Sequence, residues 1–182
     1  MFYKYNTVTK KYEGKVNNAK YNVMTGKLIE GYTDKEPPTI PEGKELFYEN
    51  NEWVLKDIDY QAIFEMNKQN KLSEVKTKFM DKLNNGIMHS TVLDKDINAR
   101  KGIDDVNVQS LIDLMTATSQ TTTQFRCADN NFIKITLDQL KQLKLEMIQF
   151  GFSLYQKKWQ LEAQIEQAKT QKELDAINVS FD

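Results

Sequence analysis

The chain has 182 residues, of which 40% are hydrophobic and 28% charged. These proportions are typical of a folded protein rather than a disordered one. Its 25 Lys and Arg are balanced by 26 Asp and Glu, so charge favours neither nucleic acid nor an anionic membrane as a partner. One Cys and one His exclude an internal disulfide and a Cys- or His-rich zinc site. Apolar runs shorter than a membrane span and the lack of a signal pattern at the N-terminus lead us to expect a cytoplasmic protein.

The composition changes near residue 56. All three prolines and four of the seven glycines precede this point, and long proline-free stretches follow it. The change predicts an α+β fold, with a small β-rich module over residues 1–56 and a helix-dominated domain over residues 57–182. We expect the second domain to hold a β-hairpin and one long helix with two apolar faces.

The β-rich module has weak but consistent strand signals. In chain order we expect strands at 2–5 and 12–16, a turn at 24–27, an extended connector at 34–43 and a hairpin turn at 49–52. Asn50 and Asn51 favour the hairpin because Asn tolerates positive φ. Tyr48 and Trp53 flank this turn. We expect them to form the core of the module, with Trp53 largely buried; the alternative is a sugar-stacking platform, which requires both rings to be exposed in one plane.

The second domain has clear helix signals. The expected elements are a helix at 59–85, a short strand around 91–93, a helix at 105–118, a hairpin with its turn at 129–131, a long helix from 137 to about 169 and a short helix at 171–177. Thr136 with Gln139 and Thr170 with Glu173 have the spacing of capping boxes, which predicts that the last two helices begin there.

The long helix has apolar residues on two sides. At about 100° per residue, one row combines Leu140, Met147, Leu154, Leu161 and Ile165, and a shorter row on roughly the opposite side combines Leu145, Ile148, Phe152, Tyr155 and Trp159. An all-round apolar helix is often simply buried in its own domain. The other interpretation makes one face an oligomer or partner surface, and the greater length of the Leu140 row favours that row.

The sequence offers no constellation for catalysis or metal binding. His89 and Cys127 lie in different expected elements, so nothing pairs a nucleophile with a base. The acidic residues between Asp94 and Asp105 lack the spacing of a calcium loop, and helix capping by Asp104 or Asp105 explains them better. We therefore expect a protein that is not an enzyme and that has no cofactor and no metal.

The residues about 70–178 resemble a domain of unknown function that recurs in phage and prophage tail-fibre and tail-fibre-assembly proteins. The matching features are a helix ending near Gly86 before a short strand, Asp-x-x-Asn-x-x-x-Leu at Asp104–Leu111, a hairpin with Asp-Asn at its turn, Thr-Leu-x-x-Leu at Thr136–Leu140 and Glu-Leu-x-x-Ile at Glu173–Ile177. The Pro37-Pro38 pair ahead of an aromatic segment with Trp53 is similar to segments of tail-fibre-associated proteins.

This resemblance implies a non-enzymatic protein that assists tail-fibre assembly by protein–protein contact, in the cytoplasm of the host bacterium. A structural virion component of the fibre or baseplate is the alternative, which would place the protein in the virion tail, and a carbohydrate-binding receptor module is a third interpretation. The expected partner is a tail-fibre or baseplate protein, together with a homo-oligomer through the long helix. The expected interface residues are Leu140, Met147, Leu154, Leu161 and Ile165, and the candidate ligand-facing aromatics are Tyr48 and Trp53.

Overall fold

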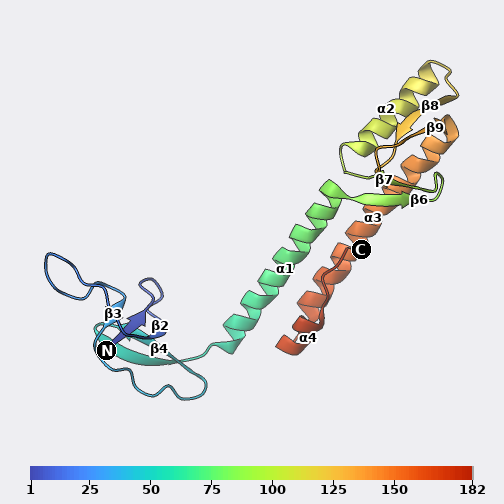
Figure 1. Ribbon diagram of the computed structural model, residues 1–182. Helices are drawn as coiled ribbons and strands as arrows, with labels where there is room; N and C mark the ends of the chain where they lie inside the picture. Colours follow the sequence, from blue (N-terminus) through green and yellow to red (C-terminus); the bar gives the residue numbers. More distant parts are fainter. Residues whose placement is uncertain (182) are drawn as a thin grey trace. The chain divides into compact units, whose positions relative to one another are not determined.

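The computed structural model describes residues 1–181 and divides the chain into two compact units, Met1–Ala62 and Ile63–Asp182. Strands make up the first unit and helices dominate the second, so the predicted α+β class is confirmed (Figure 1). The division falls in the first turn of a helix, a few residues beyond the change in composition near residue 56.

The first unit holds two small antiparallel sheets. The elements are β1 (Phe2–Tyr5), β2 (Tyr12–Val16) and β3 (Tyr32–Thr33) in the order β2-β1-β3, and β4 (Lys44–Glu49) paired with β5 (Glu52–Asp57). Asn50 and Asn51 have φ of 49° and 67°, which is the geometry of a two-residue type I′ turn and confirms the hairpin. The turn expected at 24–27 closes only an isolated bridge between Tyr21 and Leu28.

The second unit contains four helices and two β-hairpins in its described part. In chain order these are α1 (Tyr60–Asn85), β6 (Ile87–Ser90), β7 (Lys95–Asn98), α2 (Asp104–Ala117), β8 (Thr122–Arg126), β9 (Phe132–Thr136), α3 (Leu137–Gln167) and α4 (Gln171–Ala176). α1 ends at Asn85, as expected. Gly86 follows it, and only glycine fits there because a Cβ would lie 2.4 Å from the carbonyl oxygen of Lys82. The capping box of Thr136 and Gln139 is also confirmed at the start of α3.

The strand expected around residues 91–93 is wrong, because these residues form the turn between β6 and β7. The carboxylate of Glu146 on α3 fixes this turn. It accepts hydrogen bonds from the Ser90 hydroxyl at 2.6 Å, the Thr91 N–H at 3.0 Å and the Val92 N–H at 3.2 Å. A side chain from a distant helix thus supplies the acceptor that a strand would otherwise have found in its neighbour.

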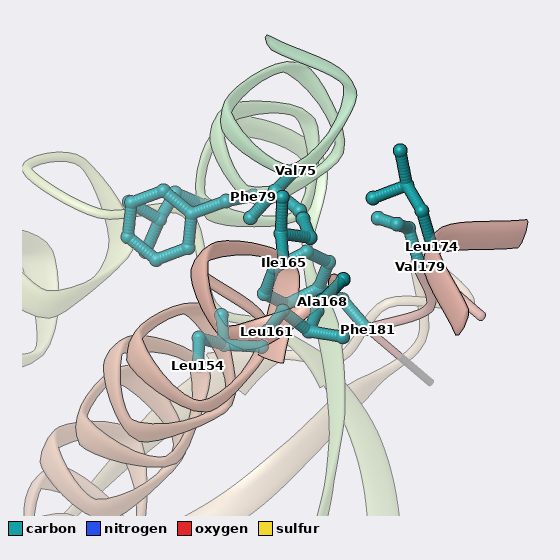
Figure 2. Close-up of a cluster of buried hydrophobic side chains, with 10 residues drawn as sticks. Val75, Phe79, Leu154, Leu161, Ile165, Ala168, Leu174, Val179 and Phe181 are labelled. Atoms are coloured by element: carbon teal, nitrogen blue, oxygen red, sulfur yellow. The ribbon is translucent and has the colours of Figure 1, made fainter. Parts of the chain in front are cut away.

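Two hydrophobic clusters follow one another along α3. Its first half packs with α2 and the hairpins around Ile97, Met115, Ile135, Leu140 and Leu143. Its second half packs with α1 and with the C-terminal segment, by which we mean α4 and the residues up to Phe181. The buried side chains of this cluster converge between the helices (Figure 2). Phe150 contacts both clusters, so α3 is the element that joins the two halves of the unit.

Candidate protein-contact surface

The row of α3 expected to form an interface is core. Leu140, Met147, Leu154, Leu161 and Ile165 are all buried within the chain. The first two lie in the cluster with α2, and the other three lie in the cluster with α1 and the C-terminal segment. The expectation of a partner on this face is therefore wrong. The row is long because it serves two successive clusters, not because a second molecule extends it.

The opposite row of α3 is exposed except at Tyr155, which is half-buried and whose ring packs on Phe79 of α1 with centroids 4.9 Å apart. Four large apolar side chains on it have more than half of their surface open to solvent: Leu145 at 61%, Ile148 at 55%, Phe152 at 54% and Trp159 at 53%. The rings of Phe152 and Tyr155 each contact that of Trp159, with centroids 6.4 Å and 5.9 Å apart. We call Leu145, Ile148, Phe152, Tyr155 and Trp159 the α3 contact row.

A pocket of about 310 Å³ opens beside the middle of the α3 contact row. Ile148, Phe152 and Tyr155 form one side of it. The other sides come from the end of α1, the segment after β7 and the start of α2; these residues are Leu83, Ala99, Arg100, Lys101 and Asp105. Gly151 also lines the pocket, and a Cβ there would meet nothing within 4 Å. The surface is therefore a row with a hollow beside it, which suits an inserted side chain.

The charges at this pocket are held by local contacts. Arg100 forms an ion pair with Asp104 at 2.8 Å. The Arg100 guanidinium, through its hydrogen bonds, holds the pKa of the Asp104 carboxyl below its usual value. Lys101 donates a hydrogen bond of 2.6 Å to the Tyr155 hydroxyl and lies over the Tyr155 ring. The two Lys101 contacts, together with the Phe79 ring, fix the Tyr155 ring at the junction of the pocket and the row.

The expectation that Asp104 or Asp105 caps α2 is also wrong. The N-cap residue is Ile103, whose side chain makes no capping hydrogen bond, and Asp105 accepts a hydrogen bond of 3.0 Å only from the N–H of the next residue, Val106. Asp104 is the first residue of the helix, and its carboxylate accepts hydrogen bonds from the backbone N–H and the guanidinium of Arg100. The acidic residues there still complement the helix dipole. In the described residues, no group of three or more His, Cys, Asp or Glu side chains is arranged to hold a metal ion.

The two side chains that could act in catalysis, His89 and Cys127, have different environments. His89 is exposed on β6, where its Nδ1 lies 3.0 Å from Asp96. Cys127 follows β8 and is buried, and this burial raises the pKa of its thiol. A buried thiol with a raised pKa is a poor nucleophile. Neither residue lines the pocket beside the α3 contact row.

The aromatic pair of the first unit does not form an exposed plane. Tyr48 is buried, and its hydroxyl bonds to Thr33 and Asn51. Trp53 is half-buried rather than largely buried, and its Nε1 donates to the carbonyl of Lys35. The two rings meet at 63°. The requirement of a flat, exposed sugar platform is not met, because Tyr48 is core.

The sequence shows that the α3 contact row is apolar. The greater length of the Leu140 row nevertheless favoured that row as the interface, and this choice is wrong. A better signal lay at the row's ends. Lys141 precedes it, and Glu162 and Glu166 follow it, at the same phase of the helix. The Leu140 row continues instead into Ala168, close to the buried C-terminal residues Leu174, Val179 and Phe181. Charged ends indicate a solvent-facing row, whereas apolar continuation indicates core.

Comparison with known families gives one match in this region. Residues 66–178 match the family described as a domain of unknown function, DUF4376. No curated protein and no solved structure matches the chain. None of the helices in the described residues is long and apolar enough to cross a membrane.

Proposed function

The chain belongs to the DUF4376 family, and we propose that it works by binding protein rather than by catalysis, as a tail-fibre-associated factor of a phage or prophage. Its role is to assist fibre assembly, with a tail-fibre or baseplate protein as the client. The phage context comes from the sequence resemblance of residues 70–178 and of the Pro37-Pro38 segment. Assembly of the fibre in the host cytoplasm is the setting that this role implies.

The observation that carries the binding role is the α3 contact row. Single exposed apolar residues are normal, but a contiguous apolar patch on a soluble protein marks a contact site. Here aromatic residues make up much of the patch, and Trp and Tyr are enriched where proteins bind one another. The row also lies within the matched residues 66–178, so it belongs to the domain that defines the family.

Fibre assembly in the native host tests this proposal. Replacing Phe152 and Trp159 with glutamate places two charges on the exposed row. We expect particles made with this variant to carry few or no fibres and the fibre protein to accumulate unassembled, because the contact surface is lost. The readout is electron microscopy of particles together with the soluble fraction of fibre protein. Normal fibres in the absence of the whole gene would contradict the assembly role.

Two further measurements sharpen the result. Lys157→Glu is the matched control, because Lys157 is an exposed residue of α3 away from the contact row; this variant should assemble fibres normally. Purified particles then separate the two roles that the resemblance leaves open. An assembly factor is absent from them, whereas a component of the fibre or baseplate is present in fixed proportion.

A further inference from the structure

The α3 contact row has the spacing of a coiled-coil seam. With its charged ends it comprises Lys141, Leu145, Ile148, Phe152, Tyr155, Trp159, Glu162 and Glu166. Successive members are alternately four and three residues apart. This spacing keeps their side chains on one face of α3, as in a helix that packs against a second helix in a coiled coil. The row spans about 38 Å, at about 1.5 Å per residue. This is a surface shaped for another helix rather than for a small molecule.

The charges at its ends select the orientation of that second helix. Lys141 lies at the N-terminal end, and Glu166 lies at the C-terminal end. Both are exposed, and neither is in an ion pair within the described residues. A parallel second copy would set Lys141 against Lys141 and Glu166 against Glu166, which is repulsive. An antiparallel second copy sets Lys141 of each chain against Glu166 of the other, which is attractive.

The antiparallel register also places the central apolar residues of the row against one another. Aligning Lys141 with Glu166 sets Ile148 opposite Trp159, and Phe152 opposite Tyr155, around a two-fold axis. Toward either end the same register sets Leu145 opposite Glu162, whose carboxylate is paired with Lys158 of its own chain at 2.6 Å. Trp159 of the second copy then lies against Ile148, beside the pocket of about 310 Å³. One flank of the row carries Lys144 and Lys158, but each is held within its own chain, Lys144 by a hydrogen bond to Gln109 and Lys158 by an ion pair with Glu162. The other flank consists of the uncharged residues Gln142, Gln149, Gln156 and Ala163. No like charges would therefore meet along that flank when the two copies approach.

We infer that the α3 contact row binds a second copy of this chain, as an antiparallel two-fold pair centred between Phe152 and Tyr155. The inference rests on the proposed role of the row as a protein-contact surface and names its occupant. An isologous pair uses the same patch on both copies, and a row with opposite charges at its two ends is self-complementary only in this arrangement. The Leu140 row takes no part, because it is buried within each copy.

Sedimentation equilibrium of the purified full chain tests the inference. The wild type should sediment at twice the 21.2 kDa of one chain, and Phe152→Glu with Trp159→Glu should sediment as a single chain with unchanged circular dichroism. A wild-type protein that stays at 21.2 kDa at about 100 µM would overturn the pair. If that monomer still needs Phe152 and Trp159 for fibre assembly, the contact role stands, and the occupant is the fibre protein instead.

Charge reversal tests the orientation. Lys141→Glu and Glu166→Lys, each alone, should weaken the pair at least tenfold, because each creates two like-charge contacts across the axis. The double reversal should restore the wild-type dissociation constant. Lys157→Glu is the matched control: it makes the same charge change on an exposed residue of α3 away from the row, and it should leave the constant unchanged. A double reversal that remains as weak as the single variants overturns the antiparallel arrangement.

Discussion

Replacing Leu154 and Leu161 with glutamate together should unfold the helical unit. Both side chains are buried between α3, α1 and the C-terminal segment. An unpaired buried carboxylate costs several kcal/mol, and an ordinary domain has only about 5–15 kcal/mol of stability. The cost of burying two such charges is therefore comparable to the whole free energy of unfolding of the unit. Far-UV circular dichroism at 25 °C should show the loss of most of the helical signal.

The matched control lies on the other side of the same helix. Phe152→Glu with Trp159→Glu introduces the same two charges on side chains that are about half exposed, so its helical signal should stay close to that of the wild type. The two double variants thus separate core from surface on one helix. A Leu154 and Leu161 variant that melts within a few degrees of the wild type would show that the Leu140 row is not core.

Glu146→Gln should destabilise the second unit by about 1.5–3 kcal/mol at pH 7, the usual range for hydrogen bonds to a charged group. Burial raises the pKa of the Glu146 carboxyl, but hydrogen bonds from Ser90, Thr91 and Val92 outweigh burial and leave the pKa below its usual value. Glutamine keeps the shape but offers one oxygen acceptor in place of two, and Ser90 is fully buried. Urea unfolding of the full chain measures the change.

The effect of Glu146 should depend on pH with a definite sign. Because its pKa is lowered in the folded state, its contribution is present above the unfolded-state pKa of about 4.3 and is lost as pH falls through the folded-state value. The difference between the wild type and Glu146→Gln should therefore shrink below about pH 4. Glu74→Gln, which removes an exposed ion pair with Lys78, should cost less than about 1 kcal/mol at any pH. A difference for Glu146→Gln that grows on acidification would contradict the assigned role.

Local signals predicted the elements well. The two-Asn turn at Asn50 and Asn51, the capping box at Thr136 and the stop at Gly86 each depend on neighbours in the chain, and each is confirmed. The turn at Thr91 and Val92 was missed because its acceptor, Glu146, is more than fifty residues away. Local propensity cannot reveal such a contact, and it favoured a strand for β-branched residues.

The contact row could be found from the sequence, but its exposure could not. Periodicity places Leu145 to Trp159 on one face of α3. Which of two apolar faces is covered depends on where α1, α2 and the C-terminal segment pack, and that is a property of the whole unit. Leu174, Val179 and Phe181 pack against the C-terminal end of the Leu140 row and so make that row, rather than the α3 contact row, part of the core. These residues carried no signal that tied them to α3.

Cross-linking across the proposed pair is the most direct test of the claim that a second copy covers the α3 contact row. One chain carries Lys141→Cys, and a second chain with a larger tag carries Glu166→Cys; in the mixed pair the other Lys141–Glu166 contact remains intact. Cys127 is buried and should not react. A short bis-maleimide should link residue 141 of one chain to residue 166 of the other, giving a band of mixed size. A cross-link between residue 141 of two chains, or the absence of any cross-link, would contradict the antiparallel pair.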